Sequence, residues 1–220
     1  DCRGYPEDYS DYIITDKVYL DSGIVVKSFT PGDWEYTYHI AHEHGWMFGI
    51  PLQKTTGWGY LWNSEVTSEL EAQSNLINLL GEYQVEYFSE DCRQFKFKNY
   101  YAKSIVNEDG NIFVNGNRAL FLEPIQATSL GCYGLINELI IDSIENKHYD
   151  HEKYTTVMDE VIKFINLHYY NGSDYNTSFW NMAQEGAREV LDGINSAEYD
   201  WKYVIDWTPQ FRQKMFESFL

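Results

Sequence analysis

Three histidines and a glutamate lie within six residues of one another and offer the first possible chemistry, a metal site: His39, His42, Glu43 and His44. If this segment is a strand, alternation places His42 and His44 on one face and His39 on the other. Two histidines without an identifiable third ligand make a weak metal site. A partly buried strand with polar residues on one face explains the same pattern. We therefore predict no metal.

A second possible chemistry is anion binding at the start of a helix. The apolar periodicity of residues 130–144 predicts a helix with Thr128 or Ser129 as its N-cap. A short strand at 112–114 and a turn at 115–117, whose residue types tolerate positive φ, come before it. The N–H groups and the dipole of a first helical turn attract anions. An ordinary capped helix after a turn is the alternative.

Trp46 and Phe48 are the third feature. They lie in the apolar segment 44–51, and on a strand they share a face. Periodicity alone favours two core aromatics. Aromatic residues make up 17% of the chain, which suits a protein that stacks planar molecules and equally a well-packed core.

The elements that position these residues predict an α+β fold, with an antiparallel sheet in the first half and a mostly helical second half. A hairpin is expected over 12–29 with a turn at 21–23, and strands at 34–40, 44–51, 55–62, 95–98 and 101–106. A helix is expected over 65–80 with Ser64 as its N-cap. Further helices are predicted at 130–146, 151–170, 177–192 and 208–219.

Composition excludes several classes of partner. The formal net charge of −18 disfavours binding to a nucleic-acid backbone, which requires clustered Lys and Arg. The sequence lacks a run of 18 apolar residues, so we predict no membrane span. Cys2, Cys92 and Cys132 are widely spaced and form no C-x-x-C pair. Together with the absence of a signal peptide, this predicts reduced thiols and a cytoplasmic protein.

Three segments, in order, resemble the tryptophan halogenase family of flavin-dependent halogenases. Residues 117–129, Asn-Arg-Ala-Leu-Phe-Leu-Glu-Pro-Ile-Gln-Ala-Thr-Ser, look like the family's Glu-Pro-Leu-Glu-Ser-Thr-Gly segment. Residues 44–51, His-Gly-Trp-Met-Phe-Gly-Ile-Pro, are similar to its Trp-x-Trp-x-Ile-Pro signature. Residues 164–169, followed by Asp174 and Phe179-Trp180, resemble a later helical segment of the family.

The resemblance implies FADH2-dependent halogenation of an electron-rich aromatic substrate, by way of a flavin hydroperoxide and hypohalous acid. FAD, as FADH2, and a halide ion (chloride, bromide or iodide) are the implied cofactors, and a separate flavin reductase is an implied partner. In such an enzyme the flavin carries out the oxygen chemistry, and the protein positions the reactants and shields them from water. Two alternatives remain open: a hydroxylating flavin monooxygenase of the same fold, and a non-catalytic binding module with a degenerate flavin site.

The resemblance also implies roles for single residues. Trp46 and Phe48 match the family's aromatic wall between flavin and substrate. The flavin's ribityl hydroxyls would meet the segment that resembles the Gly-Asp…Pro of flavin monooxygenases, which here is Gly116, Asn117 and Pro124. The backbone amides of Thr128 and Ser129 resemble the halide cradle.

Gln126 departs from the family pattern at a catalytic position. Tryptophan-acting members have a Glu there, close to a catalytic Lys, and a Gln can neither take the ring proton nor form an ion pair with that Lys. We therefore expect substrates more reactive than tryptophan, such as phenols or activated heteroaromatics. The Lys itself would lie upstream of Asp1.

The resemblance divides the chain into three regions. Residues 1–110 would be a sheet-rich region covering the flavin, 111–146 a strand, turn and helix completing the flavin site, and 147–220 a helical region shaping the substrate pocket. The sequence has no G-x-G-x-x-G, because Trp62 stands where the third glycine after Gly57 and Gly59 would be. The chain thus resembles the C-terminal part of an FAD-dependent monooxygenase-type flavoprotein, without the unit that binds the FAD pyrophosphate. On its own it is expected to be inactive.

Overall fold

The computed structural model describes residues 1–2, 4–87 and 89–192, and these residues form two compact units. The first unit comprises residues 1–18, 98–168 and the described residues from Arg188 onward. The second comprises residues 19–97 and 169–187, and so it interrupts the first along the chain. Strands dominate the first half of the sequence and helices the second, which confirms the predicted α+β class. The helix predicted at 208–219 lies outside the described residues.

The second unit is built on a five-stranded antiparallel sheet with the order β3-β4-β5-β2-β6. Its strands are β2 (Ser22–Lys27), β3 (Tyr38–His42), β4 (Gly45–Pro51), β5 (Thr56–Trp62) and β6 (Arg93–Lys96). Within the sheet Trp46 pairs with Leu61 and Met47 with Tyr60. Because side chains alternate along a strand, Met47 and Trp46 point to opposite faces.

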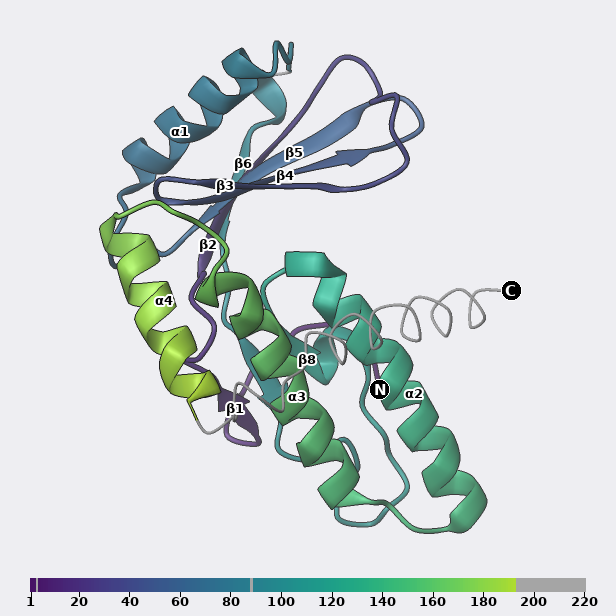
Figure 1. Ribbon diagram of the computed structural model, residues 1–220. Coiled ribbons are helices and arrows are strands. Elements are labelled where there is room, and N and C mark those ends of the chain that lie inside the picture. The colour runs from purple at the N-terminus through teal and green to yellow at the C-terminus, as the bar shows by residue number, and fades with distance from the viewer. Residues whose placement is uncertain (3, 88, 193–220) are drawn as a thin grey trace. The chain divides into compact units, whose positions relative to one another are not determined.

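Helix α1 (Glu69–Glu82) covers one face of this sheet, as Figure 1 shows. Its buried side chains pack on those of the strands in one core: Ile24, Val26, Met47, Trp58, Tyr60, Trp62, Ala72, Leu76, Leu79 and Leu80. A capping box fixes its start, since the Ser68 side chain accepts from the Glu71 amide and the Glu71 carboxylate accepts from the Ser68 amide at 2.9 Å.

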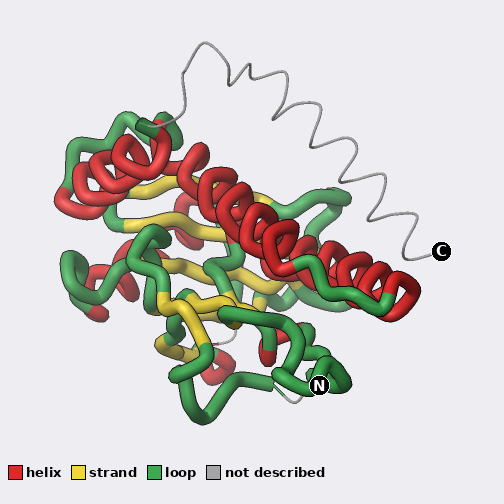
Figure 2. Tube along the Cα trace, turned by 90° about the horizontal axis from the view of Figure 1, so that it is seen from below, coloured by secondary structure: helices red, strands yellow, loops and turns green. Residues whose placement is uncertain are grey.

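The first unit contains a small antiparallel sheet of three short strands, β1 (Tyr12–Ile14), β7 (Tyr100–Ala102) and β8 (Leu120–Phe121), in the order β1-β7-β8. Tyr12 pairs with Ala102 across about ninety residues of chain. The described residues before β1 are irregular, as the green segment at the N-terminus in Figure 2 shows.

The helices that follow are α2 (Thr128–Asn146), α3 (His151–Tyr170) and α4 (Ser178–Leu191). A short turn joins α2 to α3, and the two run antiparallel, with Lys153 Nζ 2.8 Å from Asp142 Oδ2 (Figure 1). Inside the first unit, the buried Tyr154 of α3 donates its hydroxyl to the Ala102 carbonyl at 2.7 Å. The side chain of Asn166 donates to the Lys17 carbonyl at 2.9 Å. These bonds fasten α3 to the small sheet.

Several predicted elements are wrong in detail. Residues 12–29 do not form a hairpin, because β1 pairs with β7 and β2 pairs with β5 and β6. Asp21, predicted to be in the turn, instead accepts hydrogen bonds from the amide and hydroxyl of Ser64. The predicted N-cap Ser64 is thus used elsewhere, and the helix begins four residues later than expected, after Ser68.

The strand predicted at 112–114 and the N-cap predicted for α2 are also wrong. Residues 112–114 form only an isolated bridge, between Phe113 and Val106. The N-cap of α2 is Ala127, which has φ of 53° and no capping side chain. The hydroxyls of Thr128 and Ser129 bond instead to the main chain of the preceding segment.

Candidate functional site

The turn before β8 begins with a buried asparagine. The side-chain oxygen of Asn115 accepts a hydrogen bond from the Gly116 amide at 2.7 Å. Its side-chain nitrogen donates to the Tyr133 carbonyl at 3.1 Å and to Asn137 Oδ1 at 2.7 Å, and both acceptors belong to α2. Gly116 has φ of +62°, a left-handed conformation that favours glycine. Asn115 therefore ties a left-handed turn to the side of α2.

Asn117 lies within this turn, the short 3-10 segment Gly116–Arg118. Its side-chain oxygen accepts a hydrogen bond from the Tyr133 hydroxyl, and its carbonyl accepts one from the Tyr100 hydroxyl. Burial raises the pKa of Tyr133 to about 12, so this hydroxyl keeps its proton near neutral pH. The Asn117 oxygen is thus directed at α2, and the two N–H groups of the amide are its remaining donors.

The chain then runs along the first turns of α2. Ser129 Oγ accepts from the Leu122 amide at 3.0 Å and donates to the Leu122 carbonyl at 3.1 Å. Contacts with α2 therefore occur at Asn137, Tyr133 and Ser129 as the chain advances from Asn115 to Leu122. This antiparallel course holds the Gly116–Asn117 turn beside the helix.

The connection into α2 is conformationally strained. It is the 3-10 segment Ile125–Ala127, which Pro124 precedes, and the Pro124 carbonyl accepts from the Ala127 amide at 3.0 Å. Gln126 and Ala127 have φ of 52° and 53°, and both residues are exposed. A left-handed backbone costs a residue with a Cβ about 1–2 kcal/mol. Strain of this kind is concentrated at functional sites, which makes this segment a candidate for binding.

Thr128 and Ser129, the residues predicted to hold a halide, are the first two residues of α2. The Thr128 amide already donates to the Ile125 carbonyl. Helix geometry gives the first-turn amides no acceptor inside the helix, and Ser129 is the second residue of that turn. The first turn of α2, which is described throughout, contains no acidic residue, so the positive end of the helix dipole is not neutralised locally. This helix end can attract a small anion.

Trp46 and Phe48 belong to the second unit, on the sheet face opposite α1. Trp46 is 3% exposed, and its indole nitrogen donates to the Tyr169 hydroxyl at 3.2 Å. The His39 ring stacks on it with a centroid distance of 5.1 Å and an angle of 21°. Phe48 is half-buried, with its ring centroid 6.2 Å from that of Trp46. The pair forms an ordered apolar surface on β4.

Aromatic residues from the start of α4 and the end of α3 complete this surface within the second unit. The Tyr169 ring lies 5.9 Å from Trp180 and 6.2 Å from Phe179. The Trp180 nitrogen donates to the His42 carbonyl at 2.7 Å. Residues of two segments singled out in the sequence, 44–51 and 164–180, are therefore in direct contact. The remaining candidates, from Gly116 to Ser129, belong to the first unit.

The histidines are accounted for by local packing. His39 stacks on Trp46, and His42 Nδ1 lies 3.3 Å from the Tyr60 hydroxyl. Burial lowers the pKa of His42, which favours its neutral form. Among the described residues, no group of three or more His, Cys, Asp or Glu side chains is arranged to hold a metal ion. The described helices are each too short or too polar for a transmembrane segment.

Comparison with known proteins shows the family. The family model for tryptophan halogenase matches residues 6–212. Over 183 residues the chain is 24% identical to the tryptophan 6-halogenase SttH of Streptomyces toxytricini, covering 77% of this chain and 32% of that protein. Over 198 residues it is 22% identical to the tryptophan 7-halogenase RebH of Lentzea aerocolonigenes, covering 84% and 36% respectively.

A solved structure shows the same fold. The flavin-dependent halogenase BrvH of Brevundimonas sp. BAL3 matches with a TM-score of 0.59 and 23% identity, over 79% of this chain and 36% of that one. Over that part of its length the chain therefore shares the fold of this structure. This chain belongs to the tryptophan halogenase family. It spans about a third of the length of the curated relatives it matches.

Proposed function

We propose that the protein containing this chain is an FADH2-dependent halogenase that acts on an electron-rich aromatic molecule. The observation that carries the proposal is the left-handed turn at Gly116–Asn117, which Asn115 and Tyr133 fasten to the side of α2. A half-buried amide thereby lies beside the helix whose first turn can attract an anion. The family supports the reaction class.

The residues present fit a flavin at this turn. A Cβ on Gly116 would have only Cys2 Cβ nearby, at 4.0 Å, so the backbone there is open to a ligand. The Asn117 amide would donate to ribityl hydroxyls, and Pro124 fixes the backbone that follows. Reduced flavin, when bound, supplies the oxygen chemistry that oxidises the halide.

This chain's own residues would hold and separate the other reactants. The Ser129 amide would hold the halide at the positive end of the α2 dipole. The Thr128 amide, which also donates to the Ile125 carbonyl, would assist it. Trp46 and Phe48, stiffened by His39 and Tyr169, would form the wall that keeps the substrate away from the flavin. Water exclusion by such a surface would preserve a reactive oxidant.

Gln126 would determine how reactive the aromatic substrate has to be. Its neutral amide has no useful basicity near neutral pH, so the ring proton would leave without help from this residue. We propose phenols or activated heteroaromatics as substrates, rather than free tryptophan. A separate flavin reductase would supply the reduced flavin.

The test is product analysis on the intact protein with FAD, a flavin reductase, oxygen and a panel of phenols, indoles and tryptophan. Each substrate is run with chloride, bromide, iodide and no halide. We expect halogenated phenols or indoles, and product that depends on halide. Oxygenated product formed equally well without halide would establish the alternative, a hydroxylating monooxygenase.

A non-catalytic binding module is the second alternative, and flavin binding tests it. We expect the intact protein to bind FAD and the 220-residue chain alone not to bind it, because this sequence contains no G-x-G-x-x-G turn. Failure of the intact protein to bind FAD would favour the binding module. Micromolar binding by the chain alone would show that the glycine-rich turn is dispensable.

A further inference from the structure

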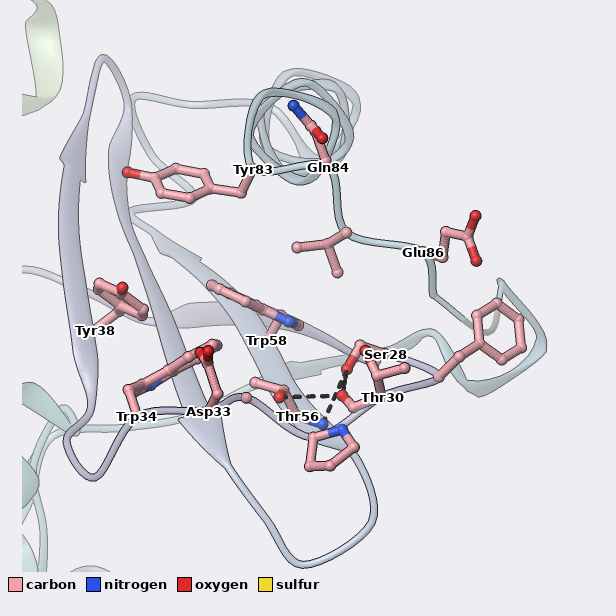
Figure 3. Close-up of a pocket in the computed structure, with 14 residues that line it drawn as sticks. Ser28, Thr30, Asp33, Trp34, Tyr38, Thr56, Trp58, Tyr83, Gln84 and Glu86 are labelled. Carbon is pink, nitrogen blue, oxygen red and sulfur yellow. Dashed lines mark hydrogen bonds between the residues drawn. The ribbon is translucent and has the colours of Figure 1, made fainter.

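We propose that the second unit contains a binding pocket for a small, flat heteroaromatic molecule that carries a carbonyl oxygen and is neutral or positively charged. The pocket has a volume of about 420 Å³ and is lined by the segment after β2, by β5 and by the end of α1 (Figure 3). Ligand pockets in proteins begin at about 300 Å³. Its floor residue Trp58 belongs to the core under α1, so the pocket lies on the sheet face opposite Trp46 and Phe48.

Aromatic rings form its walls: Trp34, Tyr38, Trp58 and Tyr83 (Figure 3). The rings of Trp58 and Tyr38 are nearly parallel, at 13°, with centroids 6.2 Å apart. The Trp34 ring stands edge-on to Tyr38 at 4.9 Å and lies 6.0 Å from Trp58. Trp58 is almost fully buried, whereas Trp34, Tyr38 and Tyr83 keep exposed surface that a planar ligand can contact.

Glycines hold the two indoles in place. Tyr38 and Trp58 flank Gly49 on neighbouring strands, and a Cβ on Gly49 would lie 2.4 Å from the Trp58 ring. A Cβ on Gly32 would lie 2.4 Å from the Trp34 ring. Each indole therefore lies flat against a glycine, where a side chain would displace it. The walls are formed before any ligand arrives.

The indole N–H groups are the observation that points to a ligand. Trp58 is 3% exposed, and the nitrogens of Trp58 and Trp34 are buried without a hydrogen-bond partner among the residues the structure describes. Buried donors normally have acceptors, and a buried donor without one is costly. In Figure 3 the nitrogen-bearing edge of Trp58 is on the side of Ser28. Each nitrogen exposes less than 1 Å², so an oxygen of a bound molecule would satisfy these donors after a small movement of the indole rings brings them to the pocket surface.

Three polar residues of the pocket, Ser28, Thr30 and Thr56, bond to one another. Ser28 Oγ accepts from the Thr56 amide at 2.9 Å and donates to the Thr30 carbonyl at 2.5 Å. Thr56 Oγ1 also donates to the Thr30 carbonyl, at 3.3 Å (Figure 3). None of these three residues accepts a hydrogen bond from the indole nitrogens. The ligand has to bring the acceptor, and a carbonyl oxygen is the simplest one.

Charge selects the kind of ligand. Asp33 and Glu86 line the pocket and are exposed, and none of the described residues lining it is Lys or Arg. Carboxylates repel an anion and attract a cation, and the faces of Trp and Tyr rings add to the attraction for a cation. A neutral or cationic ring with a carboxamide meets both requirements.

Three probes of almost identical size test this inference: nicotinamide, which is neutral, 1-methylnicotinamide, a cation, and nicotinate, an anion. Binding to the intact protein is measured by calorimetry. We expect both amides to bind and nicotinate to bind at least about tenfold more weakly, since one unfavourable charge contact of roughly 1.4 kcal/mol gives that ratio. Equal affinity for all three probes, or no binding of any, would overturn the inference.

Variants locate the binding. Trp58→Phe keeps an aromatic ring, though a smaller one, and removes the N–H, and should weaken nicotinamide binding about three- to tenfold. Trp34→Phe gives the same test at the second donor and is independent of how well Trp58→Phe folds. Glu86→Gln should reduce the penalty against nicotinate, whereas Glu65→Gln, an exposed carboxylate outside the pocket, should leave it unchanged.

The indole N–H signals of ¹⁵N-labelled protein give a direct readout. The chain has seven tryptophans, and the two variants assign the signals of Trp34 and Trp58. We expect nicotinamide to shift these two and leave those of Trp46 and Trp180, whose donors are already bonded, in place. Nicotinamide binding that moves neither pocket signal would place the ligand elsewhere and refute the pocket. None of these measurements depends on halogenation.

Discussion

Gln126 combines an exposed side chain with a left-handed backbone, immediately before the helix end that we propose to hold halide. A residue with a Cβ adopts this conformation only when its surroundings enforce it. Here Thr128 and Ser129 on one side and Pro124 on the other are bonded to the neighbouring main chain. The backbone at Gln126 is therefore held in place, so a substituted side chain would start from the same position.

Gln126→Glu should improve conversion of weakly activated substrates such as tryptophan, by up to about 10²-fold, because a positioned carboxylate can accept the ring proton. Phenols, which need little help from a base, should gain much less. The measurement is the ratio of the kcat/KM values for tryptophan and a phenol in the intact protein. The control is Gln53→Glu, which adds the same charge on an exposed loop. Equal ratios in all three proteins would mean that residue 126 takes no part in proton removal.

Gly116→Ala should lower the free energy of unfolding by about 1–2 kcal/mol, because a Cβ disfavours φ of +62°. The space around the residue is open, so any loss would reflect the backbone alone. Gly134→Ala is the matched control: it lies inside α2 with nothing near its Cβ position, and should stabilise by up to about 1 kcal/mol. Denaturant titration of both variants measures the contrast, and equal effects of the two substitutions would contradict it.

At the scale of elements, the start of α1 depends on a single capping box. Ser68→Ala should cost about 1 kcal/mol of unfolding free energy, since it removes the acceptor for the Glu71 amide. Ser74→Ala, at an exposed position inside the same helix, should be neutral or slightly stabilising. Thermal and urea unfolding of the two variants gives the comparison. Equal stability would mean that packing on the sheet alone sets where α1 begins.

Elements with a strong local signal were predicted well from the sequence. Residues 151–170 and 177–192 were expected to be helices, and α3 and α4 match them within a residue or two. Strands β4 and β5 lie where aromatic and β-branched runs predicted them. The hairpin at 12–29 failed because β1 pairs with residues ninety positions away, which no local pattern records. Ser64 has the right residue type for a cap, but Asp21 binds it.

The candidate site shows the same limit. Resemblance pointed to Gly116, Asn117 and the residues that follow, yet the groups that hold them in place were missed. Asn115 and Tyr133 were not singled out, because an asparagine before a glycine reads as an ordinary turn and a tyrosine in a helix as packing. Their role follows only from three-dimensional contacts. For the pocket at Trp34 and Trp58, the high aromatic content was likewise the only indication in the sequence.

At the scale of the whole molecule, the net charge of −18 implies considerable self-repulsion. Raising ionic strength from about 10 to 300 mM should therefore raise the melting temperature by several degrees, as the screening length falls from about 30 to below 8 Å. Sodium acetate and sodium nitrate, neither of which is a halide, should act alike. A melting temperature that is independent of either salt would refute this prediction. A further increase with chloride or bromide alone would reveal specific anion binding.

The insertion of the second unit into the first has a consequence for the order of events on the ribosome. Residues 19–97 emerge together and contain all five strands of the larger sheet and its covering helix. That sheet can close while β1 still lacks a partner, because Tyr12 must wait for Ala102. At about 5–20 residues per second, the wait is of the order of ten seconds. During that time the unpaired β1, with its exposed Ile13 and Ile14, is a natural binding segment for a chaperone.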